Sequence, residues 1–286
     1  MINLILSILF SSSLYVFFKY FEKYDINTLH AIIVNYVVAA TCGFIFFEGD
    51  VNFITVPKEQ WFFGAIALGL LFIFIFNIMA LTSQKNGLSV ASVAGKMSVV
   101  IPILFAVFVY KERLGLLKIL GILIALLAVY FTSARIKNSQ APLSKKTLIY
   151  PILLFVGSGI IDTFMKYMET NYVSTGEIPY FSAVVFSFAG LIGIMTLIIK
   201  KDFAFKWKNV LGGILLGVPN YFSIIYLLQA LQNQNLNSST VFTINNVAIV
   251  MISTILGIVV FNEKLIRKNW LGIGLAIISI ILVAST

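Results

Sequence analysis

The sequence consists of apolar runs of about 20 residues separated by short polar breaks, and this pattern restricts the chain to a membrane. A helix needs roughly 20 apolar residues to cross a hydrocarbon core of about 30 Å. The runs do not alternate between apolar and polar residues, as strands of a membrane barrel would. We expect ten transmembrane helices, approximately at residues 2–21, 28–48, 61–82, 88–110, 114–133, 147–170, 178–200, 207–231, 237–261 and 266–284.

The composition agrees with a chain that is solvated mostly by lipid. Hydrophobic residues make up 60% of the sequence and charged residues only 11%, whereas a soluble domain carries about 25% charged residues. We therefore predict an all-α, multi-pass integral membrane protein, and a bacterial inner (plasma) membrane is the expected location. The net charge of +9 comes from short loops, so it indicates membrane orientation rather than nucleic acid. The single Cys42 and single His30 exclude an internal disulfide and argue against a Cys/His metal cluster.

The two halves of the sequence resemble each other. "FFKYFE" at 17–22 matches "FMKYME" at 164–169, and "KERLGLLKILGILIAL" at 111–126 aligns without gaps on "NEKLIRKNWLGIGLAI" at 262–277. We predict a five-helix repeat over 1–133, a linker over 134–146 and a second five-helix repeat over 147–286. Because five is an odd number of crossings, the second repeat enters the membrane from the opposite side, which is an inverted-topology repeat typical of secondary transporters.

These features resemble the EamA family of the drug/metabolite transporter superfamily over the whole chain. The resemblance rests on the two five-span blocks, the proline in "VIPILFAVFVYKERL" and the twice-repeated E-x-L…L-G-I signature. It implies a ten-helix carrier of amino acids, other small metabolites or drugs, often moving them outward. The second copy has Met251 or Ile252 where the first has Pro102, so we expect a bend in span four and none in span nine.

Two charged residues are expected near the middle of the membrane. Lys96 lies nine residues after Gly87, and Asp162 lies eleven residues after Pro151. A lone charge at that depth costs at least about 2.5–3.5 kcal/mol, so the two side chains could pair or bind the two ends of a zwitterion. Alternatively, Lys96 extends to the interface, and Asp162 pairs with Lys166 one turn away.

Further polar residues complete the predicted site. Spacings of four, four and three residues put one polar stripe on span one and a matching stripe on span six; their members are Ser11, Tyr15, Lys19 and Glu22, and Ser158, Asp162, Lys166 and Glu169. We expect Tyr15 to cover apolar parts of a substrate and Lys19 and Lys166 to flank the entrances, unless these lysines only anchor helix ends. Hydrogen bonds to the substrate, or between helices, are expected from Asn77, Asn220, Asn245 and Asn246.

Other residues mark the ends of spans. Trp61, Trp207 and Trp270 begin spans and are expected at the level of the lipid headgroups. Glu112 and Glu263 begin spans five and ten, where a carboxylate favours the helix N-terminus. We therefore expect both glutamates to act as helix caps.

The predicted function is secondary transport of a small polar or zwitterionic, amino-acid-like metabolite by alternating access, with export as the expected direction. The sequence has no phosphate-binding loop and no H-E-x-x-H or G-x-S-x-G motif, so we predict neither an enzyme nor a cofactor. The expected partners are a small-molecule substrate, the lipid bilayer and possible coupling to a proton or other ion. The alternatives are an efflux carrier for hydrophobic cations and a non-transporting membrane assembly partner.

The orientation is left open by two opposing indications. The resemblance implies a cytoplasmic N-terminus, which would place five of the lysines and arginines near the membrane inside and fourteen outside. The positive-inside rule favours an N-terminus outside, unless the number of spans is one more or one fewer than ten.

Overall fold

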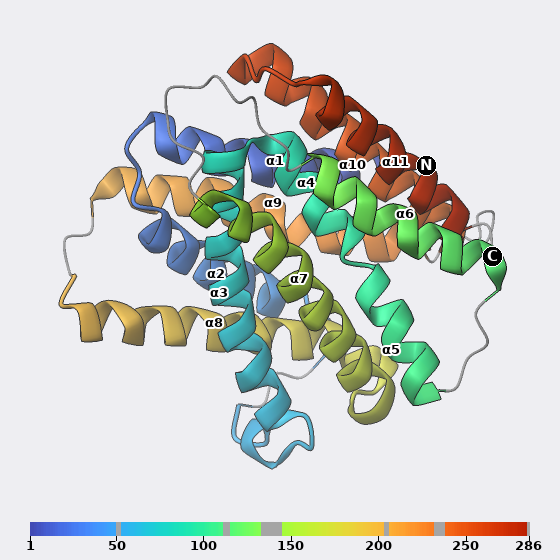
Figure 1. Cartoon of the computed structure of the whole chain (residues 1–286). Helices are drawn as coiled ribbons and strands as arrows, with labels where there is room; N and C mark the ends of the chain where they lie inside the picture. Colours follow the sequence, from blue (N-terminus) through green and yellow to red (C-terminus); the bar gives the residue numbers. More distant parts are fainter. Residues whose placement is uncertain (50–52, 111–114, 133–144, 203–205, 232–237, 285–286) are drawn as a thin grey trace. The chain divides into compact units, whose positions relative to one another are not determined.

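The computed structural model describes residues 1–49, 53–110, 115–132, 145–202, 206–231 and 238–284. Within these ranges the regular structure is entirely helical (Figure 1). The helices are α1 (Ile2–Lys23), α2 (Thr28–Ile45), α3 (Phe62–Asn86), α4 (Leu88–Met97), α5 (Val100–Tyr110), α6 (Leu116–Thr132), α7 (Lys145–Tyr172), α8 (Ile178–Lys200), α9 (Trp207–Leu231), α10 (Ser238–Phe261) and α11 (Arg267–Ala284), with short 3-10 turns at Val56–Lys58 and Thr175–Glu177.

The membrane class predicted from the apolar runs is confirmed. Among the described residues, eight helical segments are long and apolar enough to cross a membrane, and Ile119–Thr132 forms a shorter apolar helix. The chain is therefore a multi-pass, all-α integral membrane protein. The count of ten crossings and the inverted relation of the two halves remain predictions.

The chain divides into two compact units. The first unit contains residues 1–19, 78–159 and 222–286, and the second contains residues 20–77 and 160–221. Each unit draws segments from both halves of the sequence, so the units are not the two predicted repeats. They are described separately below.

The expected bend in span four is a complete break. The helix stops at Met97 and resumes at Val100, with Ser98 and Val99 in a turn (Figure 1). Pro102 then lies in the first turn of α5, where its missing N–H leaves no helical hydrogen bond unmade. The corresponding helix of the second half, α10, runs without interruption. The difference expected from the single proline is confirmed.

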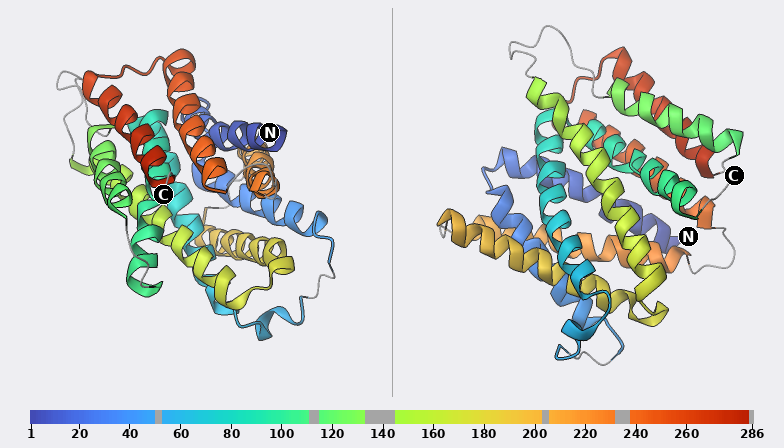
Figure 2. Two further views of the ribbon diagram at one scale, coloured as in Figure 1. Left: turned by 90° about the vertical axis from the view of Figure 1, so that its right-hand side faces the viewer. Right: turned by 60° about the horizontal axis from the view of Figure 1, so that its bottom comes forward.

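Helices α6 and α11 lie side by side in the first unit (Figure 2). Ser279 donates a hydrogen bond to the Gly121 carbonyl at 2.7 Å, and Asn269 donates one to the Thr132 carbonyl at 2.7 Å. Gly272 allows the close approach, because a Cβ there would lie 2.5 Å from the backbone nitrogen of Thr132. Two of these contacts therefore involve the glycines that the repeat places at matching positions, Gly121 and Gly272.

We expect Gly272→Ala to destabilise the protein by about 1–3 kcal/mol, because the added methyl group meets backbone rather than a movable side chain. Gly274→Ala is the matched control, since a Cβ at Gly274 meets nothing within 4 Å. Thermal unfolding in detergent measures the difference. Equal melting temperatures for the two variants would contradict the close packing of α6 and α11.

The second unit packs around α2, α8 and the start of α3. Trp61 is only 2% exposed and contacts Phe181 edge-on, with ring centroids 5.3 Å apart. The ring of Trp61 is therefore enclosed by protein, and its level at the lipid headgroups remains a prediction. Trp207 and Trp270 are exposed at the starts of α9 and α11, as the headgroup prediction requires.

Candidate functional site

Lys96 lies in the last turn of α4, immediately before the break in span four, and its side chain is half-buried. A broken membrane helix leaves backbone N–H and C=O groups without helical partners, and such groups are tolerated where they line a cavity. Discontinuous helices of this kind form the substrate sites of many secondary transporters. Lys96 therefore lies at an interrupted helix, the backbone feature that forms substrate sites in such transporters.

Tyr15 on α1 lies against α4 beside this lysine. Its side chain is 4% exposed, and its hydroxyl lies 3.0 Å from the position that a Cβ of Gly95 would occupy. The glycine that precedes Lys96 thus gives the tyrosine hydroxyl room to approach α4. Tyr15 therefore contacts α4 at Gly95, the residue that precedes Lys96.

Asn245 joins α10 to the same group of helices. The Ser7 hydroxyl on α1 lies 3.3 Å from Asn245 Oδ1 and donates to the Ser223 carbonyl of α9 at 2.9 Å. Asn245 is 2% exposed, whereas Asn246 is half-buried. Since α4 also packs on α10, the helices that carry Tyr15, Lys96 and Asn245 contact one another within the first unit.

Next to Ser7 and Ser223 the first unit contains an aromatic cluster that sequence reasoning missed. The rings of Phe10 and Tyr226 stack with centroids 5.8 Å apart, and Phe222 lies 6.1 Å from Phe10 and 5.8 Å from Tyr226. The sequence contains 26 phenylalanines, and no local pattern distinguishes these rings from the rest. The available signal was the helical spacing of three residues that separates Phe10 from Ser7 and Tyr226 from Ser223.

The other three predicted substrate-binding residues belong to the second unit. Asn220 is buried and donates to Asn35 Oδ1 at 3.2 Å, and Asn77 donates to the Ile73 carbonyl at 2.7 Å. These bonds fit the alternative role of asparagine as a link within and between helices. Asp162 is exposed on α7, and its shared site with Lys96 remains a prediction.

The two lysines of the repeated motif differ in their surroundings. Lys19 is half-buried, and its ammonium group donates to the Gln84 carbonyl at 2.7 Å, while Gln84 donates in return to the Phe18 carbonyl at 3.0 Å. Lys166 is exposed. The bond from Lys19 ties α1 to the end of α3, and the entrance role of both lysines remains a prediction.

Glu263 is a helix cap, but not of the helix that it precedes. Its Oε1 accepts a hydrogen bond from the backbone N–H of Leu88 at 2.8 Å, at the start of α4. The start of α11 is instead bonded by Asn269, whose Oδ1 accepts from the Ile266 N–H at 2.9 Å. The prediction that Glu263 caps a helix is confirmed, but the predicted helix is wrong, because Glu263 caps α4 and not α11. Glu112 lies outside the described residues.

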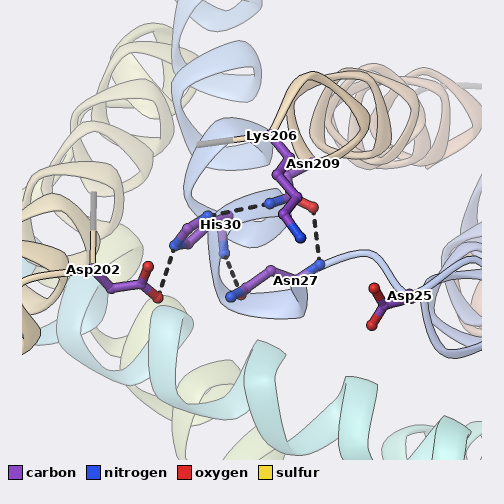
Figure 3. Close-up of a pocket in the computed structure, with 6 residues that line it drawn as sticks. All are labelled: Asp25, Asn27, His30, Asp202, Lys206 and Asn209. Carbon is purple, nitrogen blue, oxygen red and sulfur yellow. Dashed lines mark hydrogen bonds and ion pairs between the residues drawn. The ribbon is translucent and has the colours of Figure 1, made fainter. Parts of the chain in front are cut away.

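A separate polar pocket of about 290 Å³ lies in the second unit (Figure 3). It is lined by residues at the starts of α2 and α9 and near the end of α8, namely Asp25, Asn27, His30, Asp202, Lys206 and Asn209. Among the described residues, no three His, Cys, Asp or Glu side chains are grouped to hold a metal ion. At the rim, Lys208 contacts Asp25 at 3.0 Å and lowers the pKa of that carboxyl group.

The groups in this pocket bind mainly to one another. Asn209 Oδ1 accepts from the Asn27 N–H at 2.9 Å, which orients the Asn209 amide so that its Nδ2 donates to His30 Nδ1 at 3.2 Å. When the ring of His30, which is 1% exposed, is neutral, its proton lies on Nε2, 3.1 Å from Asp202 Oδ2 (Figure 3). The network therefore ties α2 to α9 and to the end of α8.

Comparison with known proteins gives the family. The model of the EamA-like transporter family matches residues 1–134 and 145–285. An uncharacterized protein of Haemophilus influenzae is 30% identical over 279 residues, which cover 95% of this chain and 93% of that protein. A protein of known crystal structure is similar with a TM-score of 0.61 over 98% of this chain and 94% of that chain. At 14% identity this likeness shows the fold alone. Because the family model matches nearly the whole length, the chain belongs to the EamA-like transporter family, whose members are membrane transporters.

Proposed function

We propose that this transporter carries a small zwitterionic metabolite of the amino-acid type, with Lys96 binding its carboxylate. The observation that carries the proposal is the position of Lys96 at the break between α4 and α5, in the helix that the buried Tyr15 contacts at Gly95. An ammonium group binds a carboxylate by a charge-assisted hydrogen bond, which is roughly twice as strong as a neutral one.

The ammonium end of the substrate needs an acceptor of opposite charge. Asp162 is our candidate, because its depth in span six matches that of Lys96 in span four. Asn245 and Asn246 on α10 supply amide groups that could orient the polar backbone of the substrate. Asn77 and Asn220 already form bonds inside the second unit, so we assign them a secondary part in binding.

The proposed mechanism is alternating access with outward transport. It rests on the repeated "FFKYFE/FMKYME" and E-x-L motifs, which support two five-helix repeats of opposite topology over 1–133 and 147–286, joined by the linker 134–146. In transporters built this way, one part rocks against the other around a site near the middle of the membrane. Lys19 and Lys166 would then draw carboxylate-bearing substrates toward the two entrances.

A panel of ligands tests the substrate class. A ligand that binds only the folded protein raises the free energy of unfolding by RT ln(1 + [L]/Kd), and the melting temperature rises with it. We expect zwitterionic amino acids to raise the melting temperature of the purified protein, and the corresponding amines and carboxylic acids to have weaker effects. Stabilisation by the amines alone would contradict a role for Lys96 in binding a carboxylate.

One observation favours a second candidate, efflux of hydrophobic cations. The clustered rings of Phe10, Phe222 and Tyr226 could bind a cation through an open ring face, at about 0.5–2 kcal/mol per contact. Lys96 opposes this alternative, because a cation near it would be repelled. The same panel separates the two, since only the second candidate predicts stabilisation by quaternary ammonium compounds and its loss in Phe10→Ala.

A further inference from the structure

The carboxylate of Glu263 connects two helices of the first unit that are far apart in the sequence. Helix α4 begins after Gly87, which has no side chain to cap it and has a φ of 102°. The first N–H of the helix, on the buried Leu88, donates instead to Glu263 Oε1 at 2.8 Å. The start of the helix that carries Lys96 is therefore held by a residue from the connection between α10 and α11.

The surroundings of this carboxylate are shaped to receive it. A Cβ at Gly87 would lie 2.8 Å from both carboxylate oxygens, and a Cβ at Gly257 would lie 2.5 Å from Oε2. The chain turns back at Asn262, which has a φ of 53°, and the Glu263 N–H donates to the Gly257 carbonyl at 2.9 Å. Gly87, Gly257 and the left-handed backbone at Asn262 thus leave space for the side chain of Glu263.

The charged groups around Glu263 are few. From α1 it faces Lys19, whose ammonium group is bonded to the Gln84 carbonyl, and from α4 it faces the hydroxyl and N–H of Ser89. Helix α10 has no charged residue, and the exposed charges nearby in sequence are Lys85 in the last turn of α3, together with Lys264, Arg267 and Lys268 beyond Glu263 itself. Burial raises the pKa of Glu263, and the Leu88 N–H, Lys19 and Ser89 offset this only in part.

We propose that Glu263 is the residue through which protons act on transport. A proton bound there favours the arrangement in which α4 is docked on the α10–α11 connection, and its loss favours release of the α4 start. Because α4 carries Lys96, the position of the substrate-binding lysine would follow the protonation of Glu263. The link to transport rests on the proposed function, whereas proton-dependent docking of α4 does not.

The direction of the effect follows from linkage. When α4 is docked, Glu263 is half-buried and its pKa lies above the ordinary value. In the proposed released arrangement the carboxyl group meets water and its pKa returns to that value. The docked arrangement therefore binds the proton more tightly, and protonation stabilises it. This stabilisation is fully present below the ordinary pKa of glutamate and is lost as the pH rises through the raised pKa of the docked state.

Hydrogen exchange of the Leu88 and Ser89 amides in the purified full-length protein tests the proposal without a substrate. After correction for intrinsic exchange rates, we expect their protection to fall as the pH rises through this window, by up to about tenfold per pH unit, the limit for one proton. In Glu263→Gln, whose amide oxygen can still accept from Leu88, we expect protection that does not change with pH. Glu48→Gln, in an exposed loop, is the control and should behave like the wild type.

Protection in the wild type that is independent of pH, or that rises with pH, would overturn the proposal. So would the same pH profile in wild type and Glu263→Gln. If the variant is too unstable to purify, the wild-type profile decides the question by itself. A failed ligand panel would overturn the substrate proposal and leave this result standing. If the substrate proposal and the pH-dependent docking of α4 are both confirmed, substrate counterflow should depend on pH in the wild type and lose that dependence in Glu263→Gln.

Discussion

Replacing Lys96 by glutamine should abolish detectable substrate binding while leaving the protein folded. In the proposed site the ammonium group binds the carboxylate of a zwitterion, and loss of one partner from a buried charge pair costs about 2–5 kcal/mol. That loss corresponds to a roughly 30- to 4000-fold weaker affinity. The ligand-induced rise in melting temperature measures it, with a zwitterion that stabilises the wild type.

The design separates a binding effect from a folding effect. Without ligand, Lys96→Gln should melt close to the wild-type temperature, because at the depth predicted for Lys96 a neutral amide is less costly than an ammonium group. Lys264→Gln, at an exposed position between α10 and α11, is the matched control and should bind normally. If Lys96→Gln binds the zwitterion with unchanged affinity, Lys96 is not part of the substrate site.

The largest loss of stability is expected for Gly87→Ala. Gly87 has a φ of 102° and a ψ of 164°, a region that is essentially restricted to glycine and costs other residues about 1–3 kcal/mol. The new methyl group would also lie 2.8 Å from both oxygens of Glu263, so the carboxylate would have to leave Leu88. Displacing the cap costs about 1 kcal/mol more.

Thermal unfolding of Gly87→Ala and Gly115→Ala measures this effect. Gly115 is the control, since a Cβ there meets nothing within 4 Å and its φ is not in the left-handed region. We expect a clear fall in melting temperature for Gly87→Ala and almost none for Gly115→Ala. If the two variants melt at the same temperature, the hydrogen bond between Glu263 and the start of α4 does not contribute to stability.

The features set by the membrane itself could be predicted from the sequence. The thickness of the hydrocarbon core fixes the length of an apolar helix, and the observed helices follow the predicted runs. The break in span four was also predictable in position, because Pro102 cannot continue a helical hydrogen-bond pattern. The uninterrupted α10, without a proline at the corresponding place, agrees with this reasoning. A proline alone does not decide a break, since α9 continues through Pro219.

Contacts between distant residues could not be predicted in the same way. Glu263 was expected to cap the helix that follows it, whereas it caps α4, 175 residues earlier in the chain. Trp61 has the sequence position of a headgroup residue but is enclosed by Phe181 and Tyr180. A single sequence reports local periodicity and depth, but it does not report which helices become neighbours.

The candidate site was predicted in part. Tyr15, Lys96 and Asn245 were selected because polar groups in apolar spans need polar surroundings, and the structure places them on three helices that contact one another. Asn220 was selected by the same argument, and it bonds to Asn35 within its own unit. An asparagine that binds substrate and one that links two helices have the same signature in sequence.

Counterflow in proteoliposomes tests the central claim most directly. Purified protein is reconstituted, the vesicles are loaded with an unlabelled zwitterionic amino acid that stabilises the protein, and uptake of the same labelled compound is followed without any imposed ion gradient. We predict rapid accumulation of label in wild-type vesicles, and accumulation no greater than that of protein-free vesicles for Lys96→Gln. Accumulation of quaternary ammonium compounds but of no zwitterion in wild-type vesicles, or equal exchange by Lys96→Gln, would contradict the proposed transport of zwitterions through Lys96.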